Sequence, residues 1–311
     1  MKKLLFPLLI ICIFTLVGCS EETVLENAKV NVIISKNFGD EELTSKEISV
    51  LEESSVMEVM EGNFDIETAY GGGFINGIDG LKSGFTGVKD KKKVDWFYYV
   101  NGIVAEVGAN EYYLGPNDLV IWDYHDWSKS IYLSSIIGAY PLNFINGHGE
   151  GNLKTEILIS QDYEKEGNGL FEFLKAEGLE SIETKGLKEE ELENGEINSI
   201  VIGTWNEISQ FDYIKDVYEN GKKAGLFFKL GENITALDAK GEISNVYEKG
   251  AVITSITKEY GLNGTLWLIT GNDEASIKRA TRLLYEEPEK IKGKFSVIVA
   301  DDDVISIPTK K

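Results

Sequence analysis

The sequence contains little cysteine and little histidine, and these two shortages limit the chemistry that the chain can carry. Of its 311 residues, two are cysteine and two are histidine. Cys12 lies inside an apolar N-terminal stretch that we expect to be removed, which leaves Cys19 as the one cysteine of the mature chain. The mature chain therefore offers no internal disulfide and no metal site built from several thiolates.

The sequence also lacks the motifs of common enzymes. It contains neither G-x-S-x-G nor H-E-x-x-H, and its carboxylates do not follow the spacing of a Ca²⁺-binding loop. The glycine-rich stretch Gly147 to Gly151 precedes a predicted strand, whereas a dinucleotide-binding loop follows one. His125 and His148 are isolated, although alternation along a strand places Asp123 on the same face as His125. We therefore predict that the protein is not an enzyme and requires no cofactor and no metal.

Basic residues are scarce beside acidic ones. The chain has 31 lysines and arginines against 52 acidic residues, which gives a net charge of −21. Such a surface repels phosphate backbones, so we expect no nucleic-acid partner. The hydrophobic content of 42% is sufficient for ordinary globular cores, and the length predicts about two domains.

The N-terminus has the composition of a secretory signal. Lys2 and Lys3 precede an apolar run from Leu4 to Val17, which is too short for an ordinary membrane-spanning helix. The sequence Leu16 to Cys19 resembles the lipobox of bacterial lipoproteins. The resemblance implies cleavage before Cys19 and a thioether-linked lipid on its sulfur.

We therefore expect residues 1–18 to be a signal peptide and residues 19–28 to be a short polar tether. The lipid on Cys19 would hold the mature protein at the extracytoplasmic face of the cell membrane.

Residues 29–127 have the pattern of a small α+β domain. Val30 to Ser35 and Phe64 to Tyr70 are predicted strands. A helix is predicted from Ser54 onwards, with Val56, Val59 and Met60 on one face. Asn101-Gly102 is a strong hairpin signal, because both residues tolerate a positive φ. These elements favour a helix lying across a mixed sheet.

Aromatic residues are concentrated in two neighbouring strands of this region, DWFYYVNG (Asp95 to Gly102) and LVIWDYHDW (Leu119 to Trp127). Alternation places Trp96, Tyr98, Trp122 and Tyr124 on one face and Phe97, Tyr99, Ile121 and Asp123 on the other. We expect the predicted helix to cover one face, so that only the other is open to a ligand. Core packing is the expected role of most of these rings.

The remainder of the chain has a different pattern. Residues 128–151 are predicted to be a connector, and residues 152–311 an α/β layered domain in which strands alternate with helices. The predicted helices are Glu164 to Ala176, Ser209 to Ala224 and Asp273 to Leu284. Asn198 to Thr204 and Thr265 to Gly271 are continuous apolar strands, typical of a sheet that is buried on both faces. Asp273 is interpreted as a helix cap, with a ligand site at the strand ends as the alternative.

Six pieces of the N-terminal region occur in one characteristic order and spacing. They are Ser54 to Met60, Phe64 to Tyr70, Gly73 to Gly80, Trp96 to Gly102, Gly108 to Tyr112 and Leu119 to Tyr124. In this order they resemble the C-terminal domain of transcobalamin and intrinsic factor, and the bacterial lipoprotein modules that share it. The resemblance covers roughly residues 30–127.

The resemblance implies a β-grasp-like fold, and cobalamin bound at the face between this domain and a second one, as in the vertebrate members. Their second domain is an all-helical barrel, whereas the second domain predicted here is α/β. The turn after Phe64 to Tyr70 and the loop at Gly108 to Tyr112 match segments near the corrinoid. The predicted ligand-binding residues are Tyr70, Gly71, Gly72, Gly73, Phe74, Ile75, Trp96, Tyr98, Gly108, Tyr112 and His125.

The glycine triplet Gly71 to Gly73 has two interpretations. Three residues without a Cβ let a ligand approach the backbone closely. The same sequence also suits a flexible strand connection or a bulge.

Two functions follow as hypotheses. In the first, the protein captures a small molecule between its domains, with cobalamin or another corrinoid as the first candidate, and passes it to a membrane transporter. In the second, the N-terminal domain docks a cell-surface protein or glycan and binds no small ligand.

Overall fold

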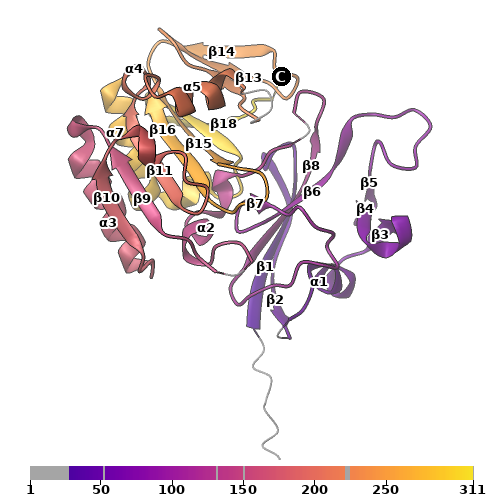
Figure 1. Cartoon of the computed structure of the whole chain (residues 1–311). Helices are drawn as coiled ribbons and strands as arrows, with labels where there is room; N and C mark the ends of the chain where they lie inside the picture. Colours follow the sequence, from indigo (N-terminus) through magenta and orange to yellow (C-terminus); the bar gives the residue numbers. More distant parts are fainter. Residues whose placement is uncertain (1–27, 52, 131, 150, 221–224, 311) are drawn as a thin grey trace, which may run out of the picture.

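The protein is a mixed α+β structure in which the two larger of four sheets lie side by side (Figure 1). The computed structural model describes residues 28–51, 53–130, 132–149, 151–220 and 225–310. The predicted signal peptide, Cys19 and nearly all of the predicted tether lie outside these ranges. Residues 28–127 are called the N-terminal half below, and residues 152–310 the C-terminal half.

The N-terminal half is built on a five-stranded mixed sheet in the order β2-β1-β8-β6-β7. β1 (Ala28–Lys36) pairs antiparallel with β2 (Glu41–Val50) and parallel with β8 (Leu119–Asp126). β6 (Val94–Val100) runs antiparallel to β8, and the short β7 (Ile103–Val104) follows the predicted hairpin turn.

Helix α1 (Val56–Asn63) lies across one face of this sheet. It begins at Ser55, whose side chain accepts a hydrogen bond from the Glu58 amide while the Glu58 carboxylate accepts one from the Ser55 amide. The predicted helix is confirmed, and this reciprocal cap places its N-cap at Ser55, one residue after the predicted start at Ser54. The buried residues of α1 share one core with Trp96, Tyr98 and Trp122.

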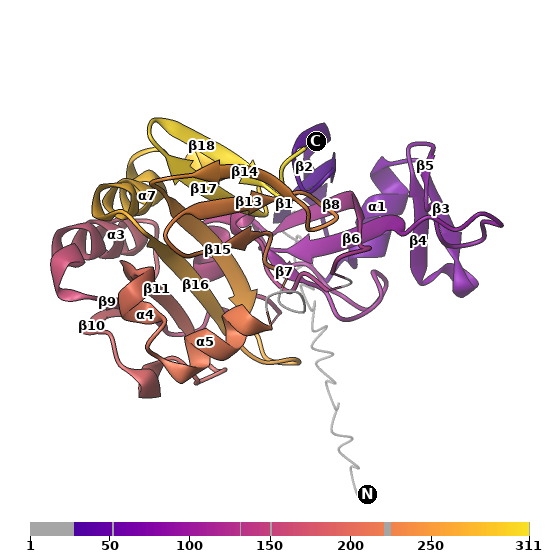
Figure 2. The same ribbon diagram turned by 90° about the horizontal axis from the view of Figure 1, so that it is seen from above.

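A small second sheet extends the N-terminal half. It consists of β3 (Ile66–Ala69), β4 (Phe74–Ile78) and β5 (Leu81–Lys82) in antiparallel order. Figure 2 shows this sheet on the side of the molecule that faces away from the C-terminal half.

The prediction that one face of the aromatic strands stays open is wrong. The face opposite α1 carries Tyr99 and Ile121, and these residues share a core with Phe227 and Phe295 of the C-terminal half. Both faces of the five-stranded sheet are therefore covered, one by α1 and the other by the second half of the chain.

The C-terminal half contains a seven-stranded sheet whose central strands are buried on both faces. The strand order is β10 (Ile182–Gly186), β9 (Thr155–Ile159), β11 (Asn198–Thr204), β16 (Thr265–Gly271), β15 (Ala251–Thr257), β17 (Ser296–Ala300) and β18 (Asp303–Ile307). The first four strands in this order, β10, β9, β11 and β16, are parallel to one another. β15 runs antiparallel to β16 and β17, and β18 runs antiparallel to β17.

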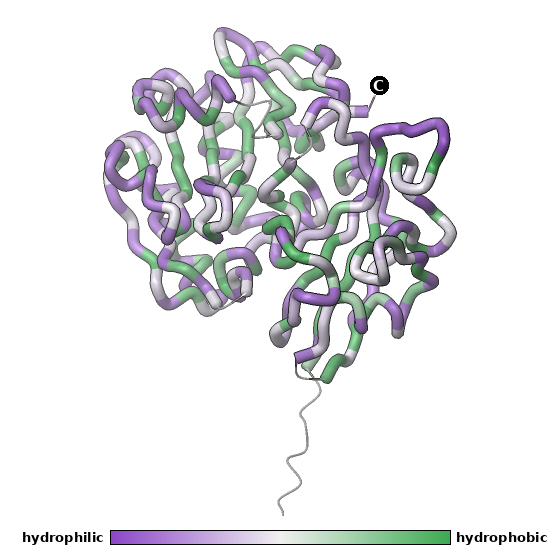
Figure 3. Tube along the Cα trace, turned by 45° about the vertical axis from the view of Figure 1, so that its right-hand side comes forward, coloured by the Kyte–Doolittle hydropathy of each residue, from purple (hydrophilic) through white to green (hydrophobic). Residues whose placement is uncertain are grey.

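Two layers cover this sheet. α3 (Glu164–Ala176) and α7 (Glu274–Glu286) pack on one face. The other face packs against α4 (Trp205–Ile208), α5 (Asp212–Glu219) and a three-stranded sheet of β12 (Phe228–Lys229), β13 (Ile234–Leu237) and β14 (Ile243–Tyr247). Figure 3 shows hydrophobic stretches along the strands of both halves and hydrophilic ones mainly in the outer loops. Within the described ranges, no helix has the length and apolar character that crossing a membrane requires.

The described part of the segment between the halves, residues 128–130, 132–149 and 151, is packed into the protein. Ile137, Tyr140 and the Phe144 of α2 (Leu142–Ile145) belong to the core beneath α3 and α7. A Cβ on Gly138 would lie 2.5 Å from the backbone of Gly293. The predicted connector is therefore a close-packed part of the contact between the halves.

Asp123 holds the turn after β1 against β8. Its carboxylate accepts hydrogen bonds from the Ser35 hydroxyl at 2.7 Å and from the amides of Phe38 and Gly39 at 2.9 and 2.8 Å. The Nδ1 atom of His125 lies 2.8 Å from the same carboxylate. Because Asp123 is fully buried, these donors have no water to replace it.

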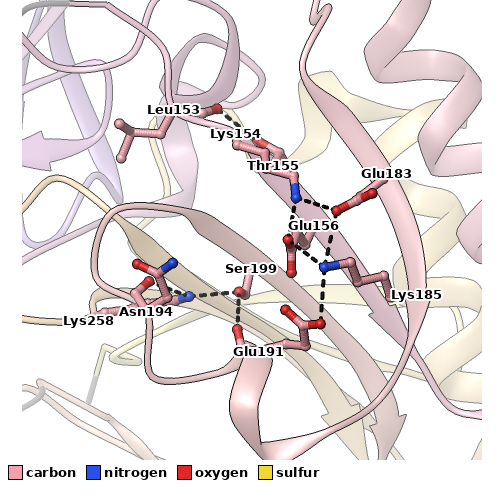
Figure 4. A network of polar contacts seen from close by, with 10 residues as sticks. All are labelled: Leu153, Lys154, Thr155, Glu156, Glu183, Lys185, Glu191, Asn194, Ser199 and Lys258. Carbon is pink, nitrogen blue, oxygen red and sulfur yellow. Dashed lines mark hydrogen bonds and ion pairs between the residues drawn. The ribbon is translucent and has the colours of Figure 1, made fainter.

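A network of ion pairs and hydrogen bonds lies at the starts of β9 and β11 in the C-terminal half (Figure 4). The buried Glu156 contacts Lys154 and Lys185, each at 2.8 Å, and Lys185 also contacts Glu191. Lys258 donates to the Ser199 hydroxyl at 2.7 Å and to the carbonyl of Asn194. Burial lowers the pKa of Lys258 to about 8, although Glu156 and Glu191 act in the opposite direction.

Replacement of Asp123 by alanine is expected to lower the free energy of unfolding by about 3 kcal/mol, because several buried donors lose their acceptor. Urea unfolding followed by circular dichroism measures the change. Asp126→Ala is the matched control, since the Asp126 carboxylate accepts one exposed hydrogen bond, from the Ser128 amide. A loss below about 1 kcal/mol for Asp123→Ala would contradict the role assigned to this carboxylate.

The Lys258 network predicts that stability rises with pH above about 8. The folded protein releases the Lys258 proton at about pH 8, whereas the unfolded chain keeps it until near its ordinary value of 10.5. The unfolded state then binds more protons, so the free energy of unfolding increases with pH in this window. Thermal unfolding between about pH 7.5 and about pH 9.5 should show this rise in the wild type and in Lys229→Met. An unchanged rise in Lys258→Met would refute the assignment.

Candidate functional site

A cavity of about 470 Å³ lies in the N-terminal half, and it is called the aromatic cavity below. It is bounded by β6, by Gly73, Phe74 and Ile75 at the start of β4, and by the loop Ala105 to Ala109. Its volume falls within the range of about 300–1,000 Å³ that is usual for small-molecule sites. The aromatic residues that line it are Phe74, Phe85, Trp96, Phe97, Tyr98, Trp122 and Trp127.

The cavity exists because β6 has a partner along only part of its outer edge. β6 pairs with β8 from Val94 to Val100, but with β7 only at Tyr99 and Val100. Beyond β7, the amide of Ala105 donates to the carbonyl of Tyr98 at 3.1 Å, and the chain then turns away. The amide of Trp96, which lies on this edge, donates to the carboxylate of Asp95 at 2.9 Å.

The rings of the cavity are fixed by hydrogen bonds at their polar atoms. The Tyr98 hydroxyl donates to the carbonyl of Val107 at 2.7 Å, and the indole nitrogen of Trp96 donates to the carbonyl of Leu81 at 3.0 Å. Tyr98 stacks on Trp122 with ring centroids 4.7 Å apart. The buried indole nitrogen of Trp122 has no hydrogen-bond partner among the described residues. The cavity therefore offers apolar ring surface and one buried donor beside it.

Asp95 is the single charged residue among those that line the aromatic cavity. Its side chain is 8% exposed. Burial raises the pKa of the Asp95 carboxyl above its usual value, and the hydrogen bonds from Trp96 and Ser83 and the nearby His125 oppose that rise. The surroundings therefore offset only part of the free-energy cost of burying the charge of the Asp95 carboxylate.

Six of the predicted ligand-binding residues line the aromatic cavity. They are Gly73, Phe74, Ile75, Trp96, Tyr98 and Gly108. Gly108 and Gly73 are glycines for a steric reason. A Cβ on Gly108 would lie 3.2 Å from the carbonyl oxygen of Gly73 and 2.7 Å from Asn110, and a Cβ on Gly73 would lie 3.2 Å from Asn110. The sequence predicted that a ligand approaches the backbone of the glycine triplet closely; in the structure, the segment at Gly108 also approaches the backbone of Gly73 closely.

The three predicted residues that precede Gly73, namely Tyr70, Gly71 and Gly72, form a turn between β3 and β4. Tyr70 is 82% exposed, and its ring meets Phe74 edge-on at 5.8 Å. Gly71 and Gly72 have φ values of 81° and 103°, which side-chain-bearing residues rarely adopt. These three residues do not line the cavity.

Tyr112 and His125 lie elsewhere. The Tyr112 hydroxyl accepts from the Gly149 amide at 2.9 Å and lies 3.3 Å from the Nδ1 atom of His148. His125 is on the opposite face of the sheet, stacked between Phe38 and Phe97 with ring centroids 4.5 Å away on each side. His125 therefore belongs to the contact between the two halves.

Sequence reasoning missed five of the aromatic and charged residues that line the cavity, namely Phe85, Asp95, Phe97, Trp122 and Trp127. Phe85 lies in a loop rich in glycine and lysine, where no periodicity reports on its surroundings. Asp95 and Trp127 flank the two aromatic strands, and that position was the available signal.

The predicted place of a ligand, between the two halves, is not where the aromatic cavity lies, because residues 73–127 supply its whole lining. A groove of about 370 Å³ does lie between the halves, beside Phe38, Asp126, Ala239 and Pro308. Within the described part of the chain, no group of three or more histidine, cysteine or acidic residues is arranged to hold a metal ion.

The comparisons with known proteins concern the N-terminal half. Residues 53–126 match the model of a family described as a domain of unknown function, DUF4430. A search of curated proteins gave no match.

Two solved structures are similar to about a third of the chain. One, from Ruminococcus gnavus, is described as that of a proposed metal binding protein; it is 19% identical, with a TM-score of 0.25, over 32% of this chain and 97% of that one. The other is haptocorrin in complex with Cbi, which is 21% identical, with a TM-score of 0.25, over 32% of this chain and 26% of haptocorrin.

Proposed function

We propose that the protein is an extracytoplasmic lipoprotein that binds a small molecule in the aromatic cavity. The observation that carries this proposal is the cavity itself, about 470 Å³ in volume and lined by seven aromatic residues with one carboxylate. Ring surfaces bind planar apolar groups, and a few polar atoms fix their orientation. Lipid on Cys19 anchors the protein to the membrane, and a transporter receives the ligand.

A corrinoid such as cobalamin is the first candidate ligand. It is suggested by the resemblance of residues 30–127 to the C-terminal domain of transcobalamin and intrinsic factor. We interpret the mixed sheet with α1 across it as β-grasp-like, and the two halves as domains. A corrin plate is larger than the aromatic cavity, so one edge or side group enters while the plate rests over the turn Tyr70 to Gly72.

Titration of the protein without its signal peptide tests this function. Cyanocobalamin and cobinamide are added separately, and binding is followed by calorimetry and by corrin absorbance. Saturable heat with one site per chain is the expected result. If neither corrinoid produces heat or a spectral change up to millimolar concentration, corrinoids are removed as ligands. The protein or glycan interaction module becomes the preferred function if other small organic molecules fail to bind as well.

A pair of matched variants locates the site. Ala105→Phe places a ring inside the aromatic cavity and is expected to weaken binding at least about tenfold, since the ring occupies ligand volume. Ala239→Phe makes the same change in the groove between the halves, and it is expected to leave affinity unchanged. If Ala239→Phe weakens binding and Ala105→Phe does not, the ligand binds in the groove between the halves. Circular dichroism confirms that each variant is folded.

A further inference from the structure

The charge in the aromatic cavity is unbalanced. Asp95 forms no ion pair with any lysine or arginine in the described ranges. The titratable groups that face it are His125 and Tyr124 on β8. The Nδ1 atom of His125 is already engaged by Asp123, so a buried carboxylate remains at the cavity with no full counter-charge.

Two rings of the same cavity already hold ammonium groups. The Nζ atom of Lys91 lies 4.6 Å from the centroid of Phe85, and that of Lys93 lies 5.3 Å from the centroid of Trp127. Phe85 and Trp127 pack edge to face with centroids 5.0 Å apart. The electrostatics of these rings therefore favour cations, and tryptophan, which the cavity contains three times, is the strongest aromatic partner for a cation.

We infer that the ligand of the aromatic cavity carries an organic cation, a quaternary ammonium or protonated amine, held between Asp95 and the surrounding rings. This inference rests on the proposed function, because it names the ligand class of the same site. It favours a ligand with an ammonium group over cobalamin, whose side chains are uncharged amides. The net charge of −21 draws cations toward the surface. An apolar cage with one carboxylate favours an organic cation over a hydrated metal ion, because alkyl groups lose little hydration on entering it.

Choline and its neutral carbon analogue 3,3-dimethyl-1-butanol are suitable probes, because they share one shape and differ in charge. Trp96, Trp122 and Trp127 line the cavity, so tryptophan fluorescence reports binding. Choline is expected to bind at least about tenfold more tightly than the alcohol. Titration with sodium chloride corrects for ionic strength.

Asp95→Asn tests the carboxylate, because the amide oxygen can still accept the hydrogen bond from Trp96. The variant should lose the preference for choline and bind the neutral alcohol as before. Asp126→Asn is the matched control and should behave as the wild type does. Choline binds the ionised carboxylate, so in the wild type its affinity should fall as the pH drops from about 7 toward about 4, and in Asp95→Asn it should not.

The outcomes separate the two proposals. Equal affinity for choline and the alcohol in the wild type, or a choline preference that persists in Asp95→Asn, would overturn the cation inference and leave small-molecule binding in place. If neither probe nor either corrinoid binds, the proposed function and the inference both fail.

Discussion

The sheet of the N-terminal half is apolar on both faces, and this constraint determines where a ligand can bind. Tryptophan and tyrosine side chains on one face and phenylalanine, tyrosine and isoleucine on the other must all be removed from water, since each contributes on the order of 2 kcal/mol when buried. Helix α1 covers the first face, and the C-terminal half covers the second. Neither face is then open over its whole width, and the aromatic cavity lies where these faces meet an edge of the sheet.

That edge is the outer side of β6, where the strand has lost its partner. An unpaired edge normally invites another strand, and proteins protect it with a charge, a bulge or a covering loop. Here Asp95 accepts the hydrogen bond of the Trp96 amide, while β4 and the loop Ala105 to Ala109 stand across the gap. The Asp95 carboxylate therefore has two roles. It protects the unpaired edge of β6 and it is the charged group of the aromatic cavity.

Local signals in the sequence predicted single elements well and their assembly less well. The helix Glu164 to Ala176, the strands Asn198 to Thr204 and Thr265 to Gly271, and the Asp273 cap are confirmed. β15 was missed, although its run of β-branched residues was available. Of the six predicted residues in the cavity, four came from a motif order, and Trp96 and Tyr98 came from the alternation of rings along a strand. The covered second face, the position of His125 and the role of Phe85 depend on contacts between distant segments, which periodicity does not report.

The carboxyl ends of the parallel strands in the C-terminal half are the other place where a ligand site could be expected. Ligands of open α/β sheets usually bind at those carboxyl ends. In this protein, Thr204 at the end of β11 forms a capping box with Glu207, and Asp273 just after β16 caps α7 through the Ser276 amide. Thr204 and Asp273 at this edge are thus engaged in starting helices. The half also contributes Phe227 and Phe295 to the contact that covers β6 and β8, the two strands whose rings line part of the aromatic cavity.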